Sequence, residues 1–211
     1  MADDSTLLML LRTIADRDLV ATARALGTSP ELVRAGIVHG ATRQRPKAYF
    51  LEGILHHVYE GDTALHVAAA AHAPEVVRDL LARGSDVGAR NRRGAQPLHY
   101  AADGGPAWPA WNPAAQAATV ALLVEAGADP NSVDRSGVAP LHRAVRTRCA
   151  LAVQALLEVG ADARRRNGSG STPMQLATRH TGRGGSGSAE ARAQQAEIVR
   201  LLEAHGAVDF A

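Results

Sequence analysis

Thr63-Ala64-Leu65-His66 is the first of four similar strings in this sequence, and the other three are Gln96-Pro97-Leu98-His99, Ala139-Pro140-Leu141-His142 and Thr172-Pro173-Met174-Gln175. The first residues of consecutive strings lie 33, 43 and 33 positions apart. A leucine-containing segment that ends in glycine follows each string, and these glycines are Gly84, Gly127, Gly160 and Gly206. Similarity that recurs with a period of this length predicts a protein built from stacked structural repeats.

The strings also have the local chemistry of helix starts. Proline at the second position loses no hydrogen bond, because its missing N–H would be unpaired in the first helical turn. Thr63 and Thr172 precede the helix as capping residues, whereas Gln96 and Ala139 do not, so we expect those two starts to be weaker by about 1 kcal/mol. The four glycines suit the left-handed position that ends a helix. Each unit is therefore predicted to contain a helix, a turn, a second helix and a hairpin.

The order of these features resembles the ankyrin repeat, in which Gly-x-Thr-Pro-Leu-His precedes a Glu-Val-Val-like helix and then Leu-Leu-x-x-Gly-Ala-Asp. Residues 61–93 are nearly a full copy of that pattern and include Glu75-Val76-Val77. The resemblance implies an all-α, mainly helical fold, an ankyrin-repeat α-solenoid of stacked helix-turn-helix units with β-hairpin or loop fingers. We expect four units, which cover residues 61–93, 94–136, 137–169 and 170–211.

Residues 1–60 lack the motif but have helical patterning. Apolar residues lie at helical spacing on one face, namely Leu7, Leu8, Leu11 and Ile14. Three further segments are assigned from their composition: a continued helix over 18–26, a helix start at Ser29-Pro30 and a short helix over 49–59. Because a repeat stack exposes apolar surface at its ends unless atypical units cover it, we expect residues 1–60 to form a helical N-terminal capping region with divergent repeat-like helices.

Two insertions, at 104–113 and 181–193, account for the irregular spacing. The first contains both tryptophans of the chain, Trp108 and Trp111. Either they fold back against neighbouring helices or they form an exposed aromatic contact, since tryptophan is enriched among residues that dominate interface energies. The second insertion is rich in glycine and serine. It lacks the lysine and the preceding strand of a phosphate-binding P-loop, so it predicts a flexible surface loop.

Composition indicates a soluble protein in a reducing compartment. The single cysteine, Cys149, excludes an intramolecular disulfide and fits the cytoplasm. The acidic start, residues 1–4, lacks the basic residues of a secretory signal. No stretch approaches the roughly 20 apolar residues of a membrane span. We expect a cytoplasmic monomer, with self-association through a C-terminal face near Val208 and Phe210 as the alternative.

The candidates for chemistry do not form a recognisable site. The ankyrin resemblance implies that His66, His99 and His142 bond between neighbouring units. Adjacent His56 and His57 would project from different helix faces, and no His-x3-His pair accompanies them. Cys149 has no family signature of a nucleophile. The sequence therefore predicts no enzyme activity, no metal and no cofactor.

The resemblance also implies where a partner binds, because ankyrin proteins usually contact partners through the hairpin tips and the first helix of each unit. The matching positions, with the insertion's tryptophans, are Arg90, Arg92, Arg93, Trp108, Trp111, Arg135, Arg146, Arg165 and Arg179. The acids near the tips are expected in several cases to pair locally, and they are Asp86, Asp129, Asp134 and Asp162.

This arginine excess has two explanations. Lys47 is the one lysine among 23 Lys and Arg residues, which codon preference alone would produce. The position of the arginines favours a function, since guanidinium groups pair with carboxylates through two parallel hydrogen bonds. The sequence thus predicts a protein-binding scaffold or adaptor for an acidic protein partner. Nucleic-acid or other polyanion binding through the same basic stripe is the alternative, and the formal net charge of only +2 weighs against it.

Overall fold

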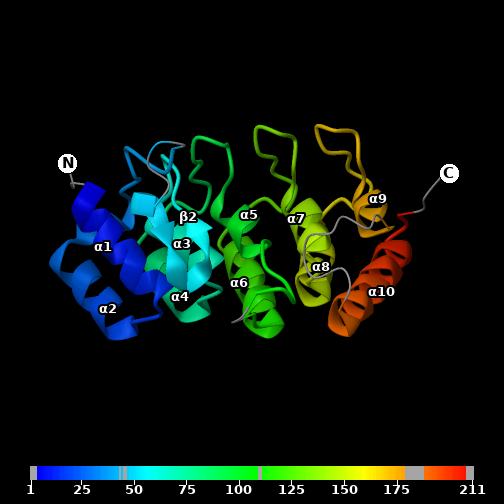
Figure 1. Cartoon of the computed structure of the whole chain (residues 1–211), viewed down its shortest axis with the longest axis horizontal. Helices are drawn as coiled ribbons and strands as arrows, with labels where there is room; N and C mark the ends of the chain where they lie inside the picture. Colours follow the sequence, from blue (N-terminus) through cyan, green and yellow to red (C-terminus); the bar gives the residue numbers. More distant parts are fainter. Residues whose placement is uncertain (1–3, 43, 45–46, 109–110, 179–187, 208–211) are drawn as a thin grey trace.

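The computed structural model describes residues 4–42, 44, 47–108, 111–178 and 188–207. Within these residues it contains ten α-helices, which stack side by side along the length of the molecule (Figure 1). They are α1 (Asp4–Ala15), α2 (Leu19–Thr28), α3 (Ala64–Ala70), α4 (Pro74–Ala82), α5 (Pro97–Ala101), α6 (Pro113–Glu125), α7 (Pro140–Thr147), α8 (Ala150–Glu158), α9 (Pro173–Thr178) and α10 (Ala189–Ala204). The mainly helical solenoid predicted from the sequence is confirmed. Arg179, Val208 and Phe210 lie outside the described residues.

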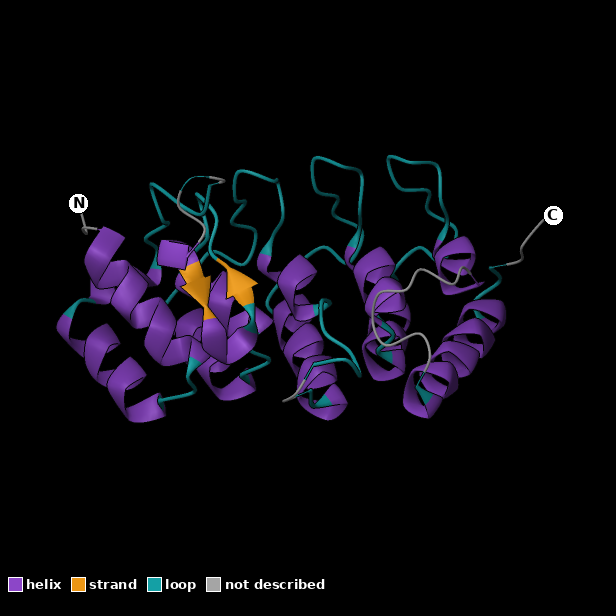
Figure 2. Ribbon diagram, in the orientation of Figure 1, coloured by secondary structure: helices purple, strands orange, loops and turns teal. Residues whose placement is uncertain are grey.

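The helices form two layers. The first helices of the repeats, α3, α5, α7 and α9, contact one another in chain order and make the first-helix layer. The second helices, α4, α6, α8 and α10, likewise contact one another and make the second-helix layer. The loops before α5, α7 and α9 project to one side of the stack as fingers (Figure 2). This arrangement places the fingers at one edge of the first-helix layer.

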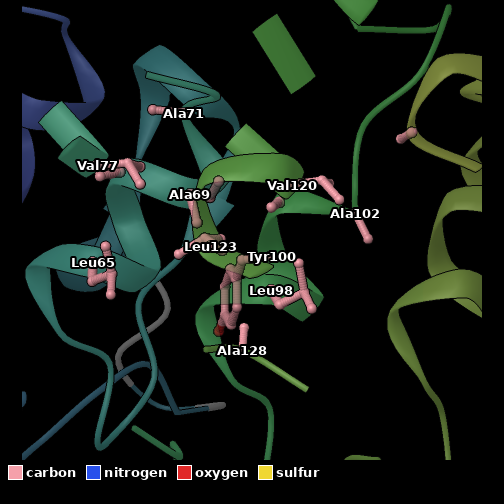
Figure 3. Packing of buried hydrophobic residues seen from close by; sticks show 14 of the residues in the cluster. Leu65, Ala69, Ala71, Val77, Leu98, Tyr100, Ala102, Val120, Leu123 and Ala128 are labelled. Carbon is pink, nitrogen blue, oxygen red and sulfur yellow. The ribbon is translucent and has the colours of Figure 1, made fainter. Parts of the chain in front are cut away.

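The core lies between the two layers. Every residue of α3 is buried, and four of its seven residues are alanines. The third position of each string is also buried, and these residues are Leu65, Leu98, Leu141 and Met174. Figure 3 shows Leu98 and Tyr100 of α5 close to Leu123 of α6. Small side chains let neighbouring helices approach closely, and the larger leucines fill the remaining space.

The N-terminal region begins with a helix pair of its own. α1 packs against α2 and against α3, so it continues the first-helix layer. Its apolar face, which includes Leu7, Leu11 and Ile14, is buried. The helix predicted over 18–26 is separate from α1, because Arg17 has a left-handed φ of 59° and the Asp18 side chain caps α2 by accepting the N–H of Ala21 at 2.9 Å. This packing supports the capping region, whose limits stay a prediction.

The predicted helix over 49–59 is wrong. The segment contains the strands β1 (Phe50–Leu51) and β2 (His56–His57), which pair antiparallel around the 3₁₀ turn η3 (Glu52–Ile54). Two more 3₁₀ turns precede it, η1 (Pro30–Val33) and η2 (Lys47–Tyr49). Leu51, Ile54 and Val58 have helical spacing and are all buried, but they reach the core from a hairpin that reverses at Leu55, where φ is 49°. Spacing alone did not distinguish these two routes to burial.

Candidate functional site

Buried histidines tie neighbouring repeats to each other. The Nε2 atoms of His66 and His99 lie 3.1 and 3.0 Å from a carbonyl oxygen of the following unit, in the pairs His66–Ala95 and His99–Val138. The Nε2 atom of His142 lies 3.0 Å from Arg165 O, in the finger that ends its own unit. The Nδ1 atom of each ring accepts the backbone N–H of the residue at the start of its own helix, in the pairs His66–Thr63, His99–Gln96 and His142–Ala139. Nε2 must therefore carry the proton and donate it. The predicted bonding between units is confirmed for His66 and His99.

Backbone hydrogen bonds join consecutive finger tips. The N–H of Arg92 donates to Glu60 O at 2.8 Å, that of Arg135 to Arg93 O at 2.9 Å and that of Gly168 to Ser136 O at 3.0 Å. The tips thus form a connected row along the edge of the stack. Arginines that belong to different repeats are held next to each other by this row.

The tip arginines differ in how much they can offer a partner. The Arg93 guanidinium lies 4.1 Å from the centre of the Tyr59 ring and its side chain is exposed. Arg92 is half-buried, lies 5.3 Å from the same ring and donates to Ala41 O. Arg135 is exposed and has no side-chain hydrogen bond or ion pair within the described part of the chain. Arg93 and Arg135 are therefore the most available cations of the tips.

The other predicted arginines are partly engaged. Arg90 donates its Nη1 to Gly94 O at 2.8 Å and to Val133 O at 2.9 Å, which braces one finger against the next. Arg146 lies 3.7 Å from the Asp103 carboxylate. Arg165 is half-buried, and its Nε is buried without a hydrogen-bond partner among the described residues. The structure thus gives several of these side chains an internal role beside any external one.

Arg143 on α7 is an arginine that the sequence analysis missed. Its guanidinium pairs with Asp103 at 3.3 Å and with Asp134 at 3.0 Å, and its side chain is only 12% exposed. Burial disfavours the ionised form of Asp134, but the N–H groups of Val138 and Ser136 and the Arg143 charge outweigh it and lower the pKa of this carboxyl.

The turn acids pair locally, as expected. Their carboxylates accept backbone N–H groups two residues further along at 2.8–2.9 Å, in the pairs Asp86–Gly88, Asp129–Asn131, Asp134–Ser136 and Asp162–Arg164. These bonds shape the loops that carry the fingers.

Trp108 and Trp111 are both half-buried. This lies between the two alternatives that the sequence left open, which were packing back against neighbouring helices and an exposed aromatic contact. Trp111 packs against the core and donates its Nε1–H to the buried Gln116 Oε1 at 2.9 Å. Trp108 and Trp111 line one pocket together with Leu55 and Ala71. Pro109 and Ala110, between them, lie outside the described residues.

Candidate catalytic groups are buried or dispersed. Burial raises the pKa of the Cys149 thiol to about 11, so the thiol stays protonated at neutral pH. Burial also lowers the pKa of His56 to about 4 and that of His99 to about 3, so these rings stay neutral. Within the described ranges there is no group of three His, Cys, Asp or Glu residues that could hold a metal ion. In the same part of the chain, none of the helices has the length and apolar character that crossing a membrane requires.

Comparisons with known sequences agree with this geometry. The sequence profile described as "Ankyrin repeats (many copies)" matches residues 52–101 and 123–177, and the profile described as "Ankyrin repeat" matches residues 93–135. The chain is 36% identical over 99 residues to the E3 ubiquitin-protein ligase KEG of Arabidopsis thaliana, which covers 44% of this chain and 6% of the ligase. It is 40% identical over 95 residues to ankyrin repeat and SOCS box protein 16 of Mus musculus, with 45% and 20% covered.

A third relative is a putative ankyrin repeat protein of Pyrobaculum aerophilum, 37% identical over 92 residues, with 44% of this chain and 30% of that protein covered. The chain spans less than a third of the length of each of these three relatives. The profiles together match residues 52–177, which contain the recurring strings through Gln175 and the histidine hydrogen bonds of the first three strings. The chain therefore belongs to the ankyrin-repeat family, whose repeats are generally scaffolds for protein–protein interaction.

Proposed function

We propose that this protein is a non-catalytic scaffold or adaptor that binds an acidic segment of a protein partner along its finger tips and first-helix layer. One observation carries the proposal. At the consecutive tips 91–94 and 134–137, the well-exposed charged side chains are Arg93 and Arg135, whereas the one acid, Asp134, is 9% exposed and paired with Arg143. These two tips therefore present positive charge to a partner.

The geometry favours binding of an extended acidic segment. The tip-to-tip hydrogen bond between the Arg135 N–H and Arg93 O holds these residues on adjacent fingers. The Tyr59 ring stacks on Arg93 and limits its freedom, so less conformational entropy is lost when a carboxylate pairs with it. Arg90, Arg92, Arg146 and Arg165 would extend the same surface, and Arg179, which lies outside the described residues, stays a sequence-based candidate. Charges of this kind increase the association rate and make it dependent on salt.

The proposal includes a monomer in the cytoplasm. The single cysteine, Cys149, is free and buried, which fits a reducing compartment. The neutral, buried histidines and the protonated thiol favour a role without catalysis.

Fluorescence anisotropy with a labelled ten-residue peptide of alternating Asp and Glu tests this function. The variant Arg93→Glu/Arg135→Glu should bind at least about tenfold more weakly, a change of about 1.4 kcal/mol, and wild-type binding should weaken as salt rises. Arg24→Glu/Arg78→Glu is the matched control, because it changes the net charge equally at exposed positions of α2 and α4. The control should bind within about twofold of wild type.

Equal binding by the tip variant and the control would contradict the proposal. A labelled single-stranded oligodeoxythymidine of equal charge is measured in parallel. Tighter binding of the oligonucleotide than of the peptide would indicate that the partner is a nucleic acid and not a protein.

A further inference from the structure

A pocket lies where the N-terminal hairpin, the end of α3 and the first insertion meet. Its volume is about 160 Å³, and it is lined mainly by Ile54, Leu55, Ala71, Trp108 and Trp111. None of these five side chains is charged. Because the residues that line the pocket range from Arg17 to Trp111, only the folded chain forms it. We call it the tryptophan pocket.

Three polar side chains of the pocket walls, those of His72, Arg17 and Trp111, have hydrogen-bond partners inside the protein. The His72 Nε2 atom lies 3.1 Å from Asp103 O, and burial lowers the pKa of this histidine to about 4, so the ring is neutral. Arg17 donates its Nη2 to Ala71 O at 3.0 Å, and Trp111 donates its Nε1–H to Gln116. An apolar group can therefore displace water from the pocket without leaving these groups unpaired.

The edge of the pocket has an unusual backbone. Leu55 has a φ of 49°, in the left-handed region that bulky side chains rarely adopt, and its side chain is 54% exposed. His72 on the other side has a φ of 48°. Backbone strain of this kind is found preferentially at ligand-binding sites. Here it holds an apolar side chain out at the edge, where burial by a partner would be favourable.

We propose that the tryptophan pocket takes a phenylalanine- or leucine-sized side chain of the protein partner. The size fits, because an apolar cavity of about 150 Å³ holds a benzene molecule. The charge fits as well: the pocket residues include one cation, Arg17, and one anion, Glu52, which balance and favour a neutral group. Tryptophan is also enriched among residues that dominate binding energy. This inference rests on the proposed protein-binding function.

Intrinsic fluorescence tests the inference, because both tryptophans of the chain line the pocket. The probes are N-acetyl-phenylalanine amide and N-acetyl-leucine amide, with excitation at a wavelength that only tryptophan absorbs. Each should change the emission in a saturable way, with a dissociation constant on the order of 1 mM for such small ligands. N-acetyl-serine amide should give no saturable change.

Leu55→Gly is the test variant. Glycine is favoured at a positive φ, so the variant should keep the fold and its melting temperature while it removes one side of the pocket. We expect the dissociation constant of the phenylalanine amide to rise at least fivefold. Val38→Ala, which truncates an apolar side chain that is 57% exposed outside this pocket, should leave it unchanged.

Three results would overturn the inference: no saturable change with either apolar amide, an equal change with the serine amide, or unchanged binding in Leu55→Gly. The probes are neutral and the anisotropy test uses an acidic peptide. Failure of the arginine-dependent binding is thus distinguishable from failure of the pocket.

Discussion

At the scale of single residues, the most constrained group is the Asp62 carboxylate, which is fully buried. It accepts hydrogen bonds from Asn91 Nδ2 at 2.8 Å, from the Tyr100 hydroxyl at 3.1 Å and from the Tyr59 N–H at 2.6 Å. Burial and the Asp62 charge raise the pKa of Tyr100, so its hydroxyl remains a donor. These bonds connect a finger residue, Asn91, to α5. They hold the first arginine-bearing finger against the first-helix layer.

Tyr100→Phe should therefore destabilise the fold. The substitution removes one donor to a buried carboxylate and one acceptor of the Asn91 amide, and leaving such groups unpaired costs about 1–3 kcal/mol. Urea unfolding followed by circular dichroism measures the change. Tyr59→Phe is the control, since that hydroxyl has no hydrogen bond within the described residues and the ring that stacks on Arg93 is kept. Equal stability of the two variants would show that the network contributes little.

At the scale of elements, each histidine of the first-helix layer joins its helix to the next finger. These rings are buried, and burial lowers the pKa of His66 and His142 and lowers that of His99 to about 3. His56 and His72, outside the strings, have a pKa of about 4 for the same reason. Protonation of any of them favours the unfolded chain, in which the ordinary value is 6.5. Acid should therefore destabilise the fold.

The contribution of these neutral histidines to the unfolding free energy should be complete above about pH 6.5, and it should decrease as the pH falls towards 4. The pKa values of Asp4 and Asp134 are lowered from 3.8, so these carboxyls lose their contribution only in more acidic solution. From pH 7.5 to pH 5, His99 alone should cost about 2 kcal/mol of unfolding free energy. Urea unfolding at the two pH values measures this loss.

His99→Gln is the matching variant. In the fourth string Gln175 accepts the Thr172 N–H at 3.2 Å, which is the bond that the histidine rings make at the other helix starts. At pH 7.5 the unfolding free energy of the variant should be about 1 kcal/mol lower than that of the wild type, because the hydrogen bond to Val138 O is lost. Between pH 7.5 and pH 5, the variant should lose about 2 kcal/mol less unfolding free energy than the wild type. An unchanged pH dependence would show that His99 titrates normally.

At the scale of the whole molecule, contacts connect neighbours along the stack. α1 packs on α2 and α3, and α10 packs on α8 and α9, so the two ends stand apart (Figure 1). Leu11 of α1 and Leu202 of α10 are both fully buried. In such a stack, energy is exchanged mainly between adjacent units.

Leu11→Ala and Leu202→Ala should each reduce the unfolding free energy by about 2–5 kcal/mol, because each leaves a cavity. The double variant should lose the sum of the two values to within about 0.5 kcal/mol, since the sites share no neighbour. Urea unfolding of all four proteins gives the coupling energy. A coupling above about 1 kcal/mol would indicate that the stack transmits strain along its length.

The sequence alone determined the repeat spacing, the helix pairs, the glycine-ended helices and the histidine ties between units. These features depend on residues that are close in sequence, and the four recurring strings report the same local structure several times. Gly84, Gly127, Gly160 and Gly206 all have positive φ, as expected from their position after the second helix.

Only the tertiary structure decided the rest of the candidate site. It replaced a predicted helix over 49–59 with a hairpin, turned Arg143 inward onto Asp103 and Asp134, and left both tryptophans half-buried around one pocket. It also showed which arginines are available to a partner: Arg93 and Arg135 are exposed, whereas Arg90 donates hydrogen bonds that hold its finger against the next one. All of these features have one physical reason. Burial and pairing depend on segments that are distant in sequence, and a local sequence pattern does not specify which distant segment packs against it.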